Sequence, residues 1–143
     1  MSKLFYILIL ILFMACSQSS NQHLKFLYFS NENMSKFDSI VSYLDSNQQF
    51  SNLFGEVLSS KDINYYLINQ LGIDSVYFNS GGCNMKARQK QYIFTFIDGE
   101  YSNIVLSKNR CSGFISHKGA EFKSLENGVK TIGLGWDWFY WEK

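Results

Sequence analysis

One short segment brings a nucleophile and a base close together in sequence. Cys111, Ser116 and His117 lie within seven residues, and a thiol or hydroxyl beside an imidazole is the pair that covalent hydrolysis uses. The pair requires a free thiolate within hydrogen-bond reach of the ring, usually with a third group that orients the imidazole. A hydrolase that uses His117 is therefore one hypothesis, and a histidine on a surface loop is the simpler alternative.

A second candidate lies near the C-terminus, where aromatic rings surround one carboxylate. Trp and Tyr rings combine flat apolar faces with a polar edge, which suits stacking on sugars or on peptide side chains. Gly133 and Gly135 would leave a shallow depression beside these rings. The alternative is that the rings belong to the core or cover the sheet and that the carboxylate faces solvent. The candidate binding residues are Trp136, Asp137, Trp138, Phe139 and Trp141.

The third candidate is a basic patch on two neighbouring strands. Alternate positions along a strand share a face, so cations spaced by two residues gather on one side. Near a membrane surface each such charge attracts anionic headgroups by about 1 kcal/mol, and the patch would also suit an acidic partner. The alternative is a solvated edge whose charge prevents strand pairing. The five residues are Lys86, Arg88, Lys90, Lys108 and Arg110.

The sequence predicts neither a metal nor a cofactor. His23 and His117 are the two histidines, and they show no ordinary zinc-ligand spacing. Gly133 and Gly135 precede a tryptophan-rich run, whereas a phosphate-binding glycine loop opens a helix. The 13 basic and 12 acidic residues nearly balance, so no global field attracts nucleic acid, and we expect no nucleic-acid partner.

The N-terminus has the layout of an export signal. Lys3 precedes an apolar run that ends at Ala15 and Cys16. The run is shorter than the roughly 20 apolar residues that a membrane-spanning helix needs. The stretch 13–16, Phe-Met-Ala-Cys, resembles the lipobox of bacterial lipoproteins. An ordinary cleaved signal or a short anchor is the alternative, because Phe13 and Met14 differ from the usual lipobox residues.

The lipoprotein resemblance covers the leader alone. It implies that Cys16 is diacylated and becomes the mature N-terminus, which would attach the protein to a membrane of the bacterial cell envelope. Two acyl chains anchor a protein stably, whereas one gives marginal binding. We expect residues 1–15 to be the signal peptide, residues 16–22 the lipidated cysteine and a polar flexible tether, and residues 23–143 a single domain.

The cysteine count agrees with this interpretation. The chain has three cysteines, and if Cys16 carries lipid, Cys83 and Cys111 remain as a pair that an oxidising compartment would allow to join. Such a loop contributes about 3 to 4 kcal/mol in the chain-entropy account. Two unpaired thiols are the alternative.

Apolar periodicity predicts helices over most of residues 35–71. Residues 24–29 are too short a pattern to decide between helix and strand, and a break is expected at 31–33. Three sets of apolar residues then recur at helical spacing, with a start signal at Ser35 and Asp38 and a stop at Gly72. The sets are Phe37, Ile40, Val41 and Leu44; Phe50, Leu53, Phe54, Val57 and Leu58; and Ile63, Tyr66, Leu67 and Leu71.

From Gly72 onward the apolar period becomes two. Strands are predicted at 73–79, 91–97, 101–107 and 131–141, with a two-residue turn at Asp98 and Gly99. In this register paired positions sum to 197, which sets Cys111 opposite Lys86, three residues from Cys83. We therefore expect an α+β fold, in which N-terminal helices pack on an antiparallel sheet of about four strands with one disulfide.

These observations favour a small, membrane-tethered, noncatalytic binding or accessory module of the cell envelope. Its partner would be an envelope protein or a glycan. A hydrolase and an inhibitor or immunity-type protein are the alternatives, and an inhibitor would need a flat rigid surface rather than a pocket.

Overall fold

The computed structural model describes residues 2–79, 91–109, 121–123, 130–135 and 137–143. The chain divides into two compact units, residues 1–32 and 33–143, and each is treated separately below.

The first unit is helical. Helix α1 (Ser2–Ser46) begins in this unit and continues into the second. Residues 24–29, which the sequence leaves undecided, are therefore helical. The helix also runs through the expected tether at 17–22, and the expected break at 31–33 is wrong, because polar residues alone do not end a helix that has no proline or glycine. Among the described residues, no helix has the length and apolar character needed to cross a membrane.

Side chains near the end of this first unit contact one another along the helix. The rings of Phe26 and Phe29 lie 5.9 Å apart, centroid to centroid. The Tyr28 phenol hydrogen-bonds to the Glu32 carboxylate, and this contact and the negative charge of Glu32 raise the pKa of Tyr28. These contacts link positions three and four apart, the spacing that brings side chains together on one helix face.

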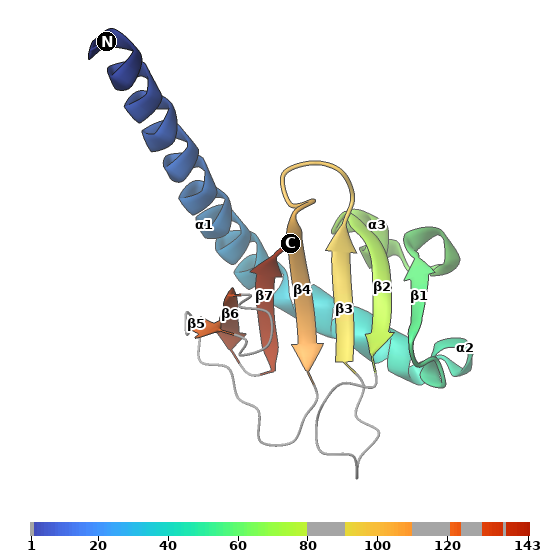
Figure 1. Cartoon of the computed structure of the whole chain (residues 1–143). Coiled ribbons are helices and arrows are strands. Elements are labelled where there is room, and N and C mark those ends of the chain that lie inside the picture. Colours follow the sequence, from blue (N-terminus) through green and yellow to red (C-terminus); the bar gives the residue numbers. More distant parts are fainter. Residues whose placement is uncertain (1, 80–90, 110–120, 124–129, 136) are drawn as a thin grey trace. The chain divides into compact units, whose positions relative to one another are not determined.

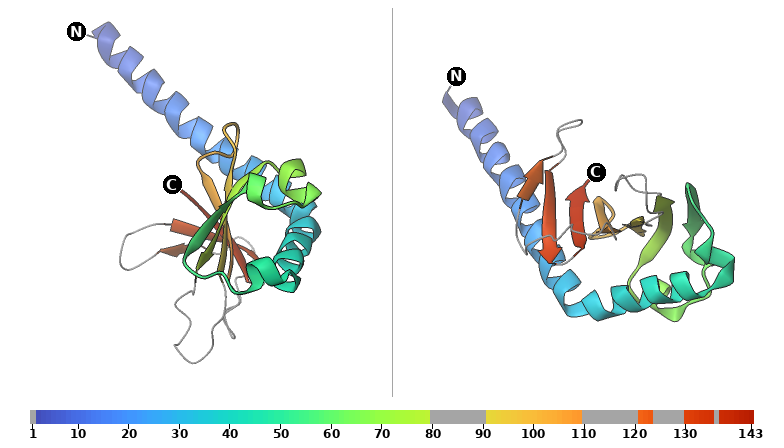
Figure 2. Two further views of the ribbon diagram at one scale, coloured as in Figure 1. Left: turned by 90° about the vertical axis from the view of Figure 1, so that its right-hand side faces the viewer. Right: turned by 90° about the horizontal axis from the view of Figure 1, so that it is seen from below.

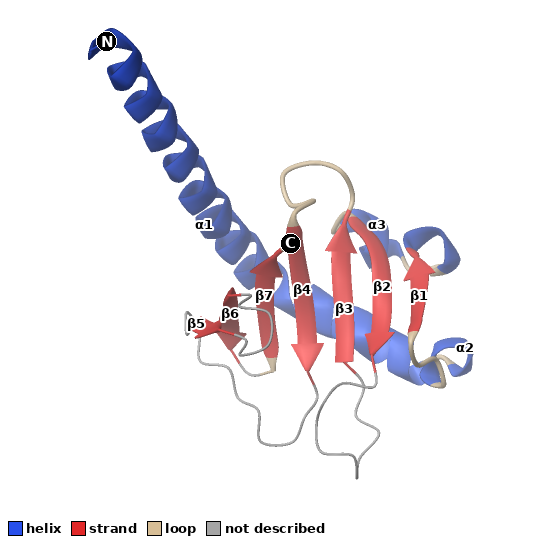
Figure 3. Ribbon diagram, in the orientation of Figure 1, coloured by secondary structure: helices blue, strands red, loops and turns tan. Residues whose placement is uncertain are grey.

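The second unit is an antiparallel sheet with helices. Its strands have the order β1-β2-β3-β4-β7-β6-β5, and every neighbouring pair is antiparallel (Figure 1). Figure 3 distinguishes these strands from the helices. The strands are β1 (Glu56–Ser59), β2 (Ile73–Asn79), β3 (Gln91–Phe96), β4 (Ile104–Asn109), β5 (Glu121–Lys123), β6 (Lys130–Gly135) and β7 (Trp138–Glu142). The predicted α+β class is confirmed, whereas the predicted sheet of about four strands is wrong, since seven are present.

Residues 33–46 of α1 cover one face of the sheet (Figure 2). The predicted stripe of Phe37, Ile40, Val41 and Leu44 is fully buried. The Phe37 ring lies 6.2 Å from that of Phe94 and 5.9 Å from that of Trp138, centroid to centroid. Burial of a large apolar side chain stabilises a fold by about 1.5 to 3 kcal/mol, so this stripe accounts for much of the attachment of the helix to the sheet.

The predicted helices after residue 46 are shorter than expected. Helix α2 (Gln48–Ser51) ends before Gly55, whose φ of +74° turns the chain, and Val57 and Leu58 then lie on strand β1. A short 3-10 helix (Ser60–Asp62) and helix α3 (Tyr66–Gln70) follow. The expected stop is confirmed, since Gly72 has a φ of +65° directly after α3.

The hairpin of β3 and β4 differs from the predicted one. Residues 97–103 form the connection, so the two-residue turn at Asp98 and Gly99 is wrong. Paired positions sum to 200, as in Gln91 with Asn109. The predicted sum of 197 is therefore wrong for the described part of this hairpin. Cys83 and Cys111 themselves lie outside the described residues.

The predicted last strand is a hairpin. β6 ends at Gly135, which has a φ of +101°, and β7 begins at Trp138. The two strands pair with each other, and their register shifts between Gly133 and Gly135. Because residues other than glycine rarely adopt such a φ, Gly135 gives the chain a reversal that periodicity alone does not reveal.

Candidate functional site

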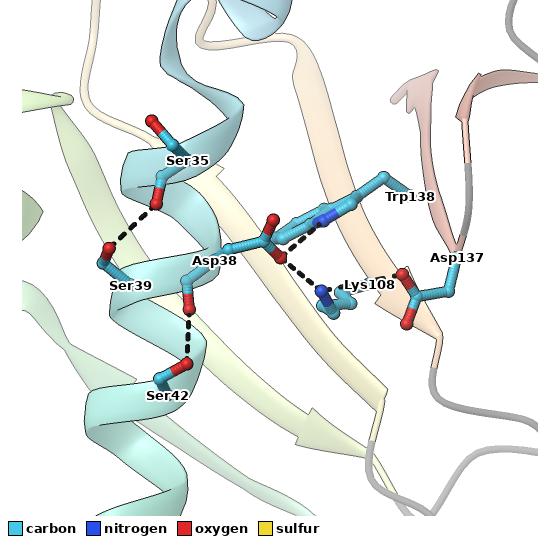
Figure 4. A network of polar contacts seen from close by, with 7 residues as sticks. All are labelled: Ser35, Asp38, Ser39, Ser42, Lys108, Asp137 and Trp138. Atoms are coloured by element: carbon cyan, nitrogen blue, oxygen red, sulfur yellow. Dashed lines mark hydrogen bonds and ion pairs between the residues drawn. The ribbon is translucent and has the colours of Figure 1, made fainter.

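A polar network joins α1 to the sheet (Figure 4). The Asp38 carboxylate accepts a hydrogen bond from Trp138 Nε1 at 3.1 Å and also pairs with the Lys108 ammonium. Lys108 Nζ lies 3.6 Å from Asp137 Oδ1 and 4.8 Å from the centroid of the Trp138 ring. Lys108 thus sits between two carboxylates and the face of an indole, an arrangement that stabilises its cation.

Three of the predicted site residues meet in this network. The Lys108 side chain is 12% exposed and that of Asp137 26%, and Trp138 is buried in the core. Lys108 is therefore not part of a solvated edge, and its charge is already compensated. Trp138 offers no ring face to a ligand. These contacts give the three residues a structural role.

The other two described aromatic residues of the candidate group lie on the opposite face. Phe139 and Trp141 alternate with the buried Trp138 and Tyr140 on β7, so they point away from α1. Both are half-buried. Their ring centroids are 5.9 Å apart and their planes differ by 24°. The two rings are therefore stacked on one another.

Neighbouring residues on this opposite face form two rows across the sheet. We call the two rows together the neutral face. One row consists of Val57, Tyr77, Ile93, Ser107, Phe139 and Gly133. The other consists of Ser59, Ser75, Thr95, Val105, Trp141 and Thr131. None of the described residues in these rows carries a charge.

Hydrogen bonds order the polar groups of this face. The hydroxyls of Ser75 and Thr95 are 2.7 Å apart, and Gln91 Nε2 donates to Ser107 Oγ at 3.0 Å. Ser107 is fully buried, whereas Ser75, Gln91 and Thr95 are partly exposed. The face therefore combines aromatic rings with oriented neutral polar groups.

The remaining predicted site residues lie outside the described residues. For the aromatic group this is Trp136, for the basic patch Lys86, Arg88, Lys90 and Arg110, and for the hypothetical nucleophilic pair Cys111, Ser116 and His117. Cys16 lies within α1, and nothing is described of its side chain. Within the described ranges, no cluster of three or more His, Cys, Asp or Glu residues could hold a metal ion.

Sequence reasoning missed Asp38 as a partner of the strands. In the sequence, Asp38 lies next to Phe37 and indicates only the start of a helix. Its contacts with Lys108 and Trp138 span 70 and 100 residues, so no local pattern predicts them. The polar members of the neutral face carried a usable signal. Thr95 lies between Phe94 and Phe96, which proved to be core, whereas Ser75 and Ser107 each have one apolar and one charged neighbour.

Comparison with known proteins identifies no relative. No protein-family model, no curated protein and no solved structure matches this chain.

Proposed function

We propose that this chain is a noncatalytic binding module that a lipid on Cys16 anchors to a membrane of the bacterial cell envelope. The neutral face is the observation that carries the binding role. It lies opposite the face that α1 covers, and it combines the Phe139 and Trp141 rings with neutral hydroxyl and amide groups. Both rings are half-buried, and partly accessible aromatic rings on a rigid support are typical of recognition surfaces.

The leader supports the location. An apolar run follows Lys3 and ends at Ala15 and Cys16, which resembles the processing site of lipoproteins. A protein held at a membrane by two acyl chains needs no spanning helix, because burial of the acyl chains supplies the anchoring free energy.

A disulfide between Cys83 and Cys111 is the second part of the proposal. With Cys16 acylated, these two cysteines are the ones left in the chain, and an envelope compartment is oxidising enough to join them. Their bond would connect the segment before β3 to the segment after β4, two strands that are already paired.

The roles of Lys108 and Asp137 favour binding over catalysis in the described region. Their charges compensate each other and that of Asp38 in a network that joins a helix to the sheet. A catalytic acid or base must remain available to a substrate, whereas groups in such a network position secondary structure.

The test is the intact mass of the protein isolated from the membranes of its own cells, before and after reduction and thiol alkylation. We expect a chain that starts at Cys16 with a diacyl increment, and two alkylated thiols that appear only after reduction. The Cys16→Ala variant, with Ser17→Ala as its control, should lose the lipid and leave the membrane fraction. An unprocessed lipid-free chain would contradict the anchor, and thiols that react without reduction would contradict the disulfide.

A further inference from the structure

We infer that the part of α1 that follows Cys16 lies along the membrane surface, with the side chains of Leu24 and Tyr28 inserted in the interfacial layer of the lipid. This inference rests on the proposed function, because a lipid on Cys16 brings the segment to the membrane. The exposure of the two side chains, their distance from Cys16 and the charge of the segment support it.

Leu24 and Tyr28 form an exposed apolar pair on α1. Each is 66% exposed, and because they are four positions apart their side chains lie on the same side of the helix. Phe26 is two positions from each and fully buried, which places it about 200° away around the helix axis. A helix that only packs against its own protein carries polar residues opposite its buried side. The exposed apolar pair therefore needs a different explanation from that of Phe26.

The exposed apolar pair is within reach of a membrane that holds Cys16. The chain is helical over this stretch, and the two residues follow Cys16 by eight and twelve positions, or about 12 and 18 Å along the helix axis. The interfacial layer on each side of a bilayer is about 5 to 8 Å thick. A helix along the membrane normal would carry Tyr28 beyond this layer, whereas a helix along the surface keeps both side chains in it. The next exposed residues, Asn31 and Glu32, are polar, so the exposed apolar surface ends at Tyr28.

The Tyr28 side chain has the properties of an interfacial tyrosine. It is exposed, and its phenol hydrogen-bonds to the carboxylate of Glu32. Tyrosine is enriched at membrane–water interfaces because its apolar ring contacts lipid while its hydroxyl remains in polar surroundings. Glu32 supplies such a polar partner within the same helix, so insertion of the ring does not leave the hydroxyl unsatisfied.

The charge of the segment is compatible with a lipid surface. Lys25 is the one residue between Cys16 and Glu32 that is charged at neutral pH. Anionic headgroups attract a cation and repel an acid, so the segment meets no repulsion before Glu32. Two apolar side chains alone bind a membrane weakly. A lipid on Cys16 keeps them at a high effective concentration beside the surface, where a weak contact is sufficient.

The experiment places a fluorescent reporter in the full, lipidated protein. Tyr28→Trp and, separately, Leu24→Trp add an indole to the exposed apolar pair, and each protein is isolated from its own membranes and reconstituted in vesicles of phosphatidylcholine and phosphatidylglycerol. The phosphatidylcholine carries bromine, a contact quencher of indole emission, near either the headgroup end or the methyl end of its acyl chains. After subtraction of the emission of the unaltered chain, which has three tryptophans, the added emission should fall by about twofold or more. Quenching should be stronger with bromine near the headgroups, because tryptophan prefers the interface.

Further substitutions test whether the exposed apolar pair makes this contact. Leu24→Gln, added to Tyr28→Trp, keeps a good helix former but removes the apolar neighbour, and it should reduce the quenching by about half. Asn31→Gln in the same background is the matched control, because Asn31 is exposed and polar on the same helix, and it should leave the quenching unchanged. Tyr66→Trp reports on an exposed ring elsewhere, since Tyr66 is 70% exposed on α3, and its added emission should not be quenched. Far-UV circular dichroism checks each fold, and either reporter suffices if the other variant fails to fold.

Four outcomes would overturn the inference. They are no quenching of either reporter in a lipidated chain, stronger quenching by bromine near the methyl ends, equal quenching of the Tyr66→Trp variant, and reporters that are unquenched but crosslink to a second copy of the chain.

The intact mass of each preparation separates this inference from the anchor. A lipidated chain whose reporters are not quenched would overturn the surface contact and leave the proposed anchor intact. A chain that lacks the lipid but shows quenched reporters would overturn the anchor and leave the surface contact intact. A lipid-free chain with unquenched reporters would overturn both.

Discussion

The indole Nε1 of Trp138 donates a hydrogen bond to the Asp38 carboxylate at 3.1 Å, although the two residues are 100 positions apart in the chain. Asp38 belongs to α1 and Trp138 begins β7, so this contact joins the first helix to the last strand. Trp138 is buried, and the Asp38 carboxylate accepts the hydrogen bond of its N–H. An unsatisfied buried polar group costs about 1 to 3 kcal/mol. The pair therefore fixes where the helix lies on the sheet.

A double-mutant cycle on this pair should detect coupling. Asp38→Ala and Trp138→Phe each destabilise the fold, the second also through lost packing against Phe37. Because both variants remove the same hydrogen bond, their effects on the free energy of unfolding should fall short of additivity by about 0.5 to 1.5 kcal/mol. Urea denaturation of the four proteins measures this difference.

A matched cycle provides the control. Ser39 lies next to Asp38 on α1, and its hydroxyl donates to the Ser35 carbonyl oxygen of the same helix at 2.8 Å. Ser39→Ala and Trp138→Phe share no contact in the described structure, so their effects should add within about 0.5 kcal/mol. Additive effects of Asp38→Ala and Trp138→Phe would show that the hydrogen bond does not contribute to stability.

Local signals in the sequence were sufficient for some elements. The sequence predicts a strand over 73–79, and β2 has these bounds. The apolar stripe that begins at Phe37 is core, and Gly72 ends a helix. In each case the information is contained in a few neighbouring residues, because side-chain alternation and the conformational freedom of glycine are local properties.

Elements that depend on distant partners were not predicted. Val57 and Leu58 fit a helical pattern, but they pair with Tyr77 and Val76 in a strand. Such pairing depends on tertiary contacts that a local pattern does not contain. The predicted register sum of 197 was also wrong, because it assumed a two-residue turn. The length of the connection at 97–103 depends on packing, such as that of the Tyr101 ring on the Phe96 ring, whose centroids are 6.4 Å apart.

The same register error hid the role of Lys108. A sum of 197 does not place Lys108 beside Tyr92, whereas the observed register does. Lys108 lies two positions from the buried Leu106 on β4, so the two side chains share one face of the sheet. The spacing of two residues from Leu106 therefore predicts that Lys108 lies on the face that α1 covers. The spacing does not reveal its partners, because Asp38 belongs to α1 and Asp137 to the turn before β7.

Gly72 is expected to resist replacement by alanine. Its φ of +65° lies in the left-handed region, where a Cβ costs about 1 to 2 kcal/mol. An added Cβ would lie 3.5 Å from Ile97 Cγ1, an ordinary contact, so backbone strain is the main cost. Gly72→Ala should lower the free energy of unfolding by about 1 kcal/mol. Gly72→Asn should cost less, because asparagine adopts this conformation more readily. Equal losses in chemical denaturation would show that space beside Ile97, and not φ, limits this position.

Replacement of Lys108 by methionine should destabilise the fold through the carboxylates that it leaves behind. Lys108 Nζ pairs with Asp38 and lies 3.6 Å from Asp137 Oδ1, so Lys108→Met keeps the apolar stem but removes the cation that both carboxylates face. The Lys108 side chain is 12% exposed and that of Asp38 49%. We therefore expect a loss of about 1 to 2 kcal/mol, between the values for surface and for buried pairs.

A second substitution distinguishes charge from packing in this variant. When Asp137→Asn is added to Lys108→Met, it removes one of the two negative charges that faced Lys108 and should restore part of the lost stability. In the unaltered chain, Asp137→Asn should be mildly destabilising, because it weakens the contact with Lys108. Lys61→Met is the control, since Lys61 is exposed in the 3-10 helix, and it should change stability by less than about 0.5 kcal/mol. If Asp137→Asn is equally destabilising in both backgrounds, Lys108 stabilises the sheet by packing over the Trp138 ring and not by compensating the two carboxylates.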